Sequence, residues 1–221
     1  MIAIGDSFTR GDELADYDDT SDWYHHSKNT WPALIAKSLN ADYKCRAVGG
    51  IGNQQISFKA SGTFNSDSLY IVNWTWFERF DYINPVTDHW ETTHPRHENK
   101  LDHYFYRNLD SELWNLFRNL QQMHSIIFLL KQHNIDFIMT CLDSMYNNKI
   151  KDLRHDSSIY KTFDAVITQL QEQVLPYIID FNGMGFLDWA KHNNYQFGPN
   201  GHPLEEAHAA AAEYIQERIK L

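Results

Sequence analysis

The chain begins Met1-Ile2-Ala3-Ile4-Gly5-Asp6-Ser7-Phe8-Thr9, a short apolar run that leads directly into a glycine, an aspartate and a serine. The apolar run predicts a buried β-strand, so the residues after it stand at the carboxyl end of that strand. This edge is where open α/β sheets bind ligands. The stretch therefore places the hydroxyl of Ser7 at a candidate functional edge. A simple turn, in which Asp6 and Ser7 bond neighbouring amides, is the alternative that this stretch alone allows.

Further apolar runs continue the pattern, and longer helical stretches separate them. The runs cover residues 43–48, 69–72, 135–140 and 177–179. Helical spacing of apolar residues is found in residues 30–39, 113–132, about 160–174 and 203–219. This alternation is typical of a parallel sheet, here of about five strands, with helices on both faces. We expect an α/β fold in a single domain over residues 1–221.

Residues 80–108 break both the helical and the strand period. A long irregular segment inside a compact domain is more often a functional loop or lid than a simple connection, so we expect an insertion that borders the site. The segment is rich in histidine, but the spacing matches no compact metal-binding motif. The residues concerned are His89, His94, His97 and His103. We therefore expect no metal ion and no cofactor.

Charge and hydropathy exclude several classes of protein. The 221 residues include 29 acidic and 19 basic side chains, a formal charge of −10, and the basic ones are scattered. Such a surface repels phosphate backbones and anionic lipids, so we expect no nucleic-acid and no membrane partner. No window approaches eighteen apolar residues, and the first residues lack the pattern of a signal peptide. We expect a soluble, cytoplasmic protein.

Three other segments are predicted to reach the edge of the sheet where Ser7 lies. Gly49-Gly50-Ile51-Gly52-Asn53 follows the second strand, and its glycines let backbone N–H groups approach a substrate oxygen. Asn73-Trp74-Thr75-Trp76 follows the third strand and offers an amide and a hydroxyl. His202 precedes Pro203, which suits the first position of the last helix. His202 would then be the N-cap, where the positive end of the helix keeps the ring neutral and available as a base.

These four blocks resemble the SGNH (GDSL-type) hydrolase family, and most closely uncharacterised SGNH-like proteins of bacteriophages. Residues 5–9 match the serine block, 49–53 the glycine block, 72–75 the asparagine block and 202–208 the histidine block. The resemblance implies a flavodoxin-like, three-layer α/β/α sandwich. It implies that Ser7 is the nucleophile and His202 its base. It also implies an oxyanion hole formed by the backbone N–H groups of Ser7 and Gly50 with an asparagine side chain.

The chain departs from the family pattern at two places. The family usually carries an aspartate shortly before the histidine, where this chain has Pro199 and Asn200. Asn200 can orient the ring through its carbonyl but cannot offset a positive charge, unless Asp180 or Asp188 reaches the ring. The third oxyanion donor is also ambiguous. Alignment by identity selects Asn73, which we prefer, whereas alignment by distance from the strand end selects Thr75.

The sequence indicates less clearly which residues would bind the substrate. Trp74 and Trp76 could form an aromatic platform for a sugar ring or an acyl chain, although core packing explains many aromatic residues. Asn53, at the end of the glycine block, is a further candidate for substrate binding. Residues 10–19 form an acidic segment, which we interpret as a solvated loop near the cleft that disfavours anionic substrates.

The sequence therefore favours a serine esterase that hydrolyses a small ester, such as an O-acyl group on a carbohydrate, through an acyl-enzyme intermediate. Its partner is the ester substrate, and the oligomeric state stays open. The first alternative is a catalytically silent, virion-associated or binding protein with the same fold, motivated by Asn200 in place of the family aspartate and by the aromatic-rich insertion. The second is acyl transfer to another alcohol by the same residues.

Overall fold

Parallel strands in the order β2-β1-β3-β6 form the central sheet of the computed structural model, which describes residues 1–18, 25–62, 64–95, 99–147 and 158–219. The strands are β1 (Ile2–Ile4), β2 (Lys44–Cys45), β3 (Tyr70–Trp74) and β6 (Phe137–Cys141). The predicted fifth strand, at residues 177–179, is reduced to a parallel bridge between Met139 and Ile178. Asp19 and residues 96–98, including His97, lie outside the described residues.

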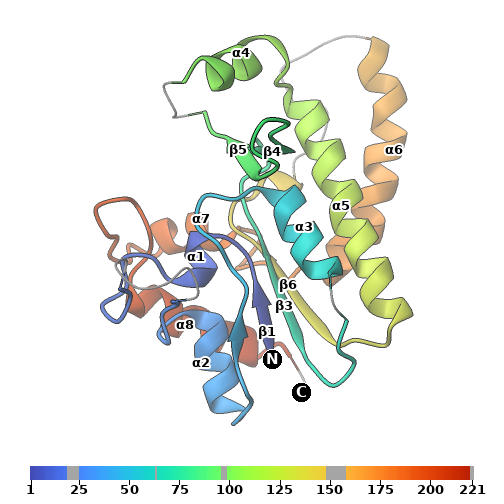
Figure 1. The fold of residues 1–221 in the computed structure, drawn as a ribbon. Helices are drawn as coiled ribbons and strands as arrows, with labels where there is room; N and C mark the ends of the chain where they lie inside the picture. The colour runs from blue at the N-terminus through green and yellow to red at the C-terminus, as the bar shows by residue number, and fades with distance from the viewer. Residues whose placement is uncertain (19–24, 63, 96–98, 148–157, 220–221) are drawn as a thin grey trace.

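Helices cover both faces of this sheet, because alternate strand residues point to opposite sides. One layer contains α3 (Asn53–Ser61), α5 (Glu112–Gln132) and α6 (Ser158–Val174). The other contains α1 (Ser7–Arg10), α2 (Trp31–Ser38), α7 (Phe186–His192) and α8 (Glu205–Gln216). Figure 1 shows the two layers on either side of the sheet. The predicted three-layer α/β/α sandwich is confirmed, but its central sheet has four strands where about five were expected.

The same alternation divides the core into two apolar clusters. Ile4 and Val72 lie in the same cluster as Leu116 of α5, whereas Ala3 and Ile71 lie in the cluster of α2 and α8. Short 3₁₀ turns lie at Met145–Asn147 and Leu175–Tyr177. Within the described residues, no helix is both long and apolar enough to cross a membrane.

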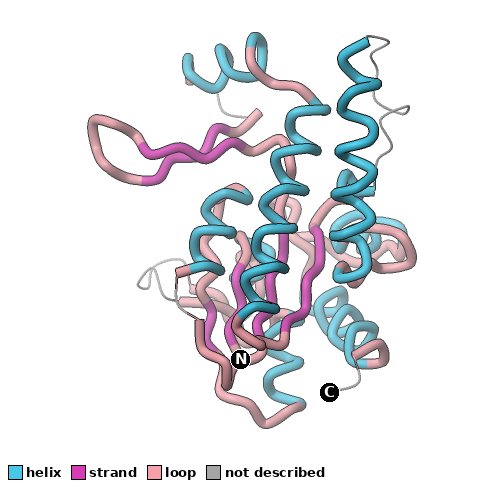
Figure 2. Tube along the Cα trace, turned by 90° about the vertical axis from the view of Figure 1, so that its right-hand side faces the viewer, coloured by secondary structure: helices cyan, strands magenta, loops and turns pink. Residues whose placement is uncertain are grey.

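The insertion at residues 80–108 is regular, contrary to the expectation of an irregular segment. It contains an antiparallel hairpin of β4 (Phe80–Ile83) and β5 (Trp90–Thr93), followed by α4 (Lys100–Asn108). Figure 2 shows the hairpin projecting away from the sheet. Asp81 fixes its base, because this buried carboxylate accepts the backbone N–H groups of Gly52, at 2.8 Å, and Gln55, at 3.0 Å. The hairpin therefore caps α3, whose N-cap glycine has no side chain to do so.

The strand order creates a crevice between the carboxyl ends of β1 and β3. After β1 the chain moves outward to β2 and then returns to β3 on the other side of β1. Loops that leave these strands therefore diverge, which makes this the usual ligand site of such sheets. The segments that follow β1, β2 and β3 all meet there, as the sequence predicts.

Candidate active site

Ser7 occupies the first turn after β1. It is the first residue of α1, and the carboxylate of Asp6, at the N-cap, accepts the Phe8 N–H at 3.1 Å. This short helix turns the chain at once, so the Ser7 hydroxyl stays at the edge of the sheet, with 6% of the residue exposed. The position agrees with the one predicted from the sequence.

His202 lies against Ser7 across 195 residues of sequence. Its Nε2 is 2.9 Å from the serine Oγ, and its Nδ1 is 2.7 Å from an oxygen of Glu13. An ionised carboxylate only accepts hydrogen bonds, so we assign the ring proton to Nδ1, which leaves Nε2 to accept the serine proton. The ring also packs on Phe8, with centroids 4.6 Å apart. Serine, imidazole and carboxylate thus form one continuous hydrogen-bonded line.

Glu13 is held in place by the loop that carries His202. One of its oxygens accepts the backbone N–H of Asn200 at 2.7 Å, and the other accepts that of His202 at 3.2 Å. Burial by itself raises the pKa of Glu13, but these hydrogen bonds and the contact with the His202 ring outweigh it and lower the pKa. Glu13 therefore stays ionised beside the ring.

The backbone makes this approach possible at two positions. Glu13 has a φ of 70°, in the left-handed region that costs a non-glycine residue about 1–2 kcal/mol. Gly198 leaves room for the carboxylate, because a Cβ there would lie 2.7 Å from the Glu13 side chain. Strain of this kind is characteristic of functional sites, where the surrounding structure enforces it.

Glu13 was not predicted from the sequence as a partner of His202. The interpretation of residues 10–19 as a solvated loop is wrong for Glu13, and the predicted direct contact of Asn200 with the ring is also wrong. The Asn200 side chain instead donates to Glu13 at 3.1 Å. Asp180 accepts the Gly183 N–H and Asp188 accepts the Ser144 hydroxyl, so neither reaches His202. The glutamate lies 189 residues from the histidine in sequence, and no local motif links the two.

His202 is also not the N-cap of the last helix. α8 begins at Glu205 with Leu204 as its N-cap, and Pro203 forms a bridge with Phe197 instead. The orientation of the ring therefore depends on Glu13 and not on the helix dipole.

The glycine block supplies an accessible backbone amide. Gly50 is exposed and has a φ of 78°, and a Cβ built there would meet nothing within 4 Å. Among the described residues, neither the Gly50 nor the Ser7 backbone N–H has a hydrogen-bond partner. Both amides are therefore available to an oxygen atom bound in the crevice.

Asn73 and Thr75, the two candidates for the third oxyanion donor, both have their side chains bonded within the protein. The Asn73 amide donates to Thr9 at 3.1 Å, and its carbonyl accepts from Thr140 at 2.8 Å. Asn73 is completely buried on the side of the sheet that faces α1. The Thr75 hydroxyl is also buried and donates to Asp6 at 2.5 Å. The expectation that Asn73 or Thr75 faces the substrate is wrong for both.

The predicted substrate-binding residues divide in the same way. Trp74 is completely buried in the core under α5, and Asn53 is buried with its amide bonded to Asn119 and to the carbonyl of Thr75. Neither can contact a substrate. Trp76 is half-buried and packs edge-on against Phe8, with centroids 5.3 Å apart. It is the predicted aromatic residue that the fold brings beside the site.

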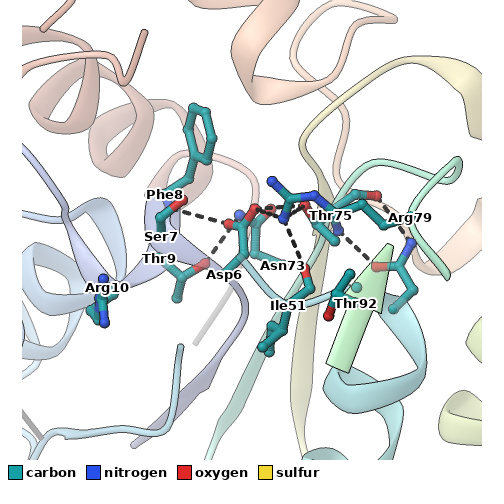
Figure 3. A network of polar contacts seen from close by, with 12 residues as sticks. Asp6, Ser7, Phe8, Thr9, Arg10, Ile51, Asn73, Thr75, Arg79 and Thr92 are labelled. Carbon is teal, nitrogen blue, oxygen red and sulfur yellow. Dashed lines mark hydrogen bonds and ion pairs between the residues drawn. The ribbon is translucent and has the colours of Figure 1, made fainter. Parts of the chain in front are cut away.

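A buried ion pair borders the serine turn. Asp6 is completely buried, and its carboxylate lies 3.3 Å from Nη1 of Arg79. Burial raises the pKa of Asp6, while the Arg79 charge and the hydrogen bonds from Thr75 and Phe8 oppose that rise. Figure 3 shows the Arg79 guanidinium between Asp6, Ile51 and Thr75. The sequence analysis did not single out Arg79, which comes from the loop after β3.

The fold of this chain resembles that of proteins with known structures. No protein-family model and no curated protein matches the sequence. Among solved structures, the chain resembles phospholipase A1 from Streptomyces albidoflavus NA297 at 14% identity, with a TM-score of 0.51, over 99% of this chain and 98% of that one. It resembles a putative lipolytic protein of the G-D-S-L family from Desulfitobacterium hafniense DCB-2 at 12% identity, with a TM-score of 0.50, over 99% and 98%.

A third similar structure is a carbohydrate esterase family 2 enzyme with a carbohydrate-binding domain from Corynascus thermopiles. The identity is 15% and the TM-score is 0.53, and the match covers 98% of this chain and 64% of that one. The chain therefore has the fold of G-D-S-L lipolytic proteins and carbohydrate esterases. The resemblance to bacteriophage proteins stays a prediction.

Proposed function

We propose that the protein is a serine esterase of the SGNH (GDSL) type, and that residues 1–221 form one such domain with an insertion at 80–108. The observation that carries this proposal is the line from Ser7 through His202 to Glu13, with contacts of 2.9 and 2.7 Å. Serine is a weak nucleophile until a base holds its proton, and a carboxylate on the far ring nitrogen fixes the tautomer of that base. All three groups are present in that geometry.

The reaction follows from this arrangement. Ser7 Oγ attacks the acyl carbon while His202 Nε2 takes the serine proton, and Glu13 stabilises the imidazolium that forms. The free amides of Ser7 and Gly50 donate to the oxyanion of the tetrahedral intermediate. The imidazolium then protonates the leaving alcohol. Water, activated by the same ring, releases the acid from the acyl-enzyme.

Support for a small ester of a polar alcohol comes from the surroundings of Ser7. Trp76 offers one aromatic surface beside Phe8, suited to a sugar ring or a short acyl chain. One of the similar structures is a carbohydrate esterase. We therefore propose an O-acyl group on a carbohydrate as the substrate class. Acyl transfer to a second alcohol uses the same residues, and product analysis with and without a sugar acceptor separates the two reactions.

The silent alternative loses one of its two motivations. The missing family aspartate no longer supports it, because Glu13 supplies a carboxylate on the imidazole from another part of the chain. The contacts of Ser7 with His202 and of His202 with the Glu13 carboxylate favour the esterase over a purely binding role.

The test is hydrolysis of p-nitrophenyl acetate by the purified chain beside its Ser7→Ala variant. We expect turnover by the parent that falls in the variant to the rate of the buffer alone, because among the described residues no other nucleophile is hydrogen-bonded to His202. An inert parent, or a Ser7→Ala variant as active as the parent, contradicts the proposal. Thermal unfolding of both proteins checks that the variant is folded.

A further inference from the structure

Arg79 occupies the position between the two turns that carry the free amides. Its Nη1 donates to the carbonyl of Ile51 at 2.8 Å and lies 3.3 Å from the Asp6 carboxylate. Ile51 directly follows Gly50, and Asp6 directly precedes Ser7. The guanidinium is thus anchored to the chain neighbours of both proposed oxyanion donors.

Two nitrogens of this guanidinium have no hydrogen-bond partner in the part of the chain that the structure describes. The Nε atom is buried without one. The Nη2 atom bonds no described residue, and unlike Nε it is not sealed from solvent. The side chain as a whole is 5% exposed, so the accessible part of the cation is confined to its tip. A buried arginine normally satisfies its donors, because unpaired ones cost free energy. The accessible Nη2 is therefore left available to donate a hydrogen bond to a bound oxygen.

The guanidinium lies beside the turn that carries Ser7. In Figure 3 the guanidinium reaches from the side of Thr75 toward Asp6 and Ser7. One face of it lies over Trp76, at 4.5 Å from the ring centroid. Trp76 in turn packs on Phe8, and Phe8 packs on His202. Arginine, nucleophile and base therefore belong to one contiguous cluster.

The charge of Arg79 is fixed and partly balanced. A guanidinium remains protonated in proteins, so it can donate hydrogen bonds but cannot act as a proton shuttle. Asp6 neutralises it in the resting site, and the ion pair keeps it from moving. A preorganised donor of this kind, held in a water-poor site, gains most when negative charge develops beside it.

We infer that Arg79 is a catalytic residue, and that its Nη2 donates the third hydrogen bond to the oxyanion, in place of the side chains of Asn73 and Thr75. This inference rests on the proposed esterase function. It assigns to the site a cationic oxyanion donor, where the sequence resemblance leads one to expect an amide. The ligand is the negatively charged oxygen of the tetrahedral intermediate, and no proton leaves the arginine.

The test compares kcat and KM for p-nitrophenyl acetate in Arg79→Ala and Arg79→Lys with those of the parent. Loss of one oxyanion donor costs about 10²–10³ in kcat, so we expect a fall of that size for Arg79→Ala with little change in KM. Arg79→Lys keeps the charge beside Asp6 and carries the test if the alanine variant does not fold. We expect it to recover only part of the lost kcat.

Chemical rescue separates catalysis from support of the fold. Guanidinium ions, at concentrations well below those that unfold the protein, should raise kcat of Arg79→Ala and leave Ser7→Ala inactive. Arg118→Ala is the matched control, because Arg118 is also a buried arginine with unpaired nitrogens. Its hydrogen bonds within the described residues go to Asn115 and to the carbonyls of Phe77 and Arg79, and none goes to the turn that carries Ser7. The Arg118→Ala variant should lose thermal stability and keep kcat within about threefold, since it removes no oxyanion donor.

The outcomes distinguish this inference from the proposed function. A parent without Ser7-dependent turnover overturns both. An active parent with folded Arg79 variants whose kcat stays within threefold overturns the role of Arg79 alone. A loss that guanidinium does not rescue, or that Arg118→Ala reproduces, also overturns it. A selective fall in kcat with rescue supports it.

Discussion

Asp6 and Glu13 lie on either side of Ser7 in the sequence, and each carboxylate pairs with a basic side chain. Asp6 is completely buried against Arg79, whereas the Glu13 and His202 side chains keep 11% and 14% of their surface exposed. The buried pair contains a cation that cannot release its proton, and the accessible pair contains an imidazole that can. Burial thus holds one side of the nucleophile rigid, while the other side is left free to move a proton.

The largest expected effect tests the accessible pair. Glu13→Gln keeps the shape of the side chain but removes the charge, and its amide can donate to Nδ1 and so stabilise the wrong tautomer. By analogy with carboxylate-to-amide changes in catalytic triads, we expect kcat for p-nitrophenyl acetate to fall by about 10⁴. Asp12→Asn is the control, because Asp12 pairs with Arg10 and does not contact His202. Similar activity in both variants would remove Glu13 from the mechanism.

A smaller loss is expected when Glu13 is displaced rather than neutralised. Gly198→Ala places a methyl group 2.7 Å from the Glu13 side chain, so the carboxylate must leave its present position beside the ring. Misplacement of a catalytic group by about 1 Å can cost up to 10²-fold, so we expect kcat to fall by about 10- to 100-fold. Gly62→Ala, where the added Cβ lies 3.4 Å from its nearest neighbour, is the matched control. Equal kcat values in the two variants would show that Gly198 does not position Glu13.

The Glu13 and Gly198 variants alter the accessible ion pair. A second histidine, His208, shows what complete burial does to an imidazole. His208 is 1% exposed, and its Nδ1 accepts the Trp31 N–H at 3.2 Å. Burial, followed by the neighbouring His202, lowers the pKa of His208 to about 3. A depressed histidine pKa stabilises the fold above the unfolded value of about 6.5, and that stability is lost as the pH falls toward the folded value.

We therefore expect the His208 contribution to the folding equilibrium constant to fall about tenfold per pH unit below pH 6.5. Urea unfolding at several pH values measures this, with His208→Asn as a variant that keeps an acceptor and does not titrate. The acid loss should be shallower in the variant by that amount. Parallel curves for the two proteins would contradict a buried neutral His208.

The accessible pair of Glu13 and His202 and the buried pair of Asp6 and Arg79 also differ in how far the sequence predicts them. Ser7 and His202 follow from local signals, an apolar run before Gly5 and a Gly-His-Pro turn before a helix. Glu13 does not, because its contact with the ring depends on a left-handed residue and on a loop 189 residues away. No spacing rule connects such segments.

On the buried side, tertiary packing explains why the prediction for Asn73 was wrong. Asn73 lies at the predicted place in the chain, but Thr9 and Thr140 occupy its amide, and these partners are known only once α1 and β6 have packed. Arg79 gave no signal, because a lone arginine after a strand is usually a solvated residue. The strands of the parallel sheet were predicted by their apolar runs, whereas the hairpin strands β4 and β5 and the short α7, with seven residues, were missed.

Covalent labelling of the purified chain by a fluorophosphonate tests the central claim most directly, because only an activated serine reacts. We predict one adduct, located on Ser7 by peptide mass spectrometry, that is absent from Ser7→Ala and strongly slowed in Glu13→Gln. A folded parent that never labels, or an adduct on a residue other than Ser7, would contradict the account.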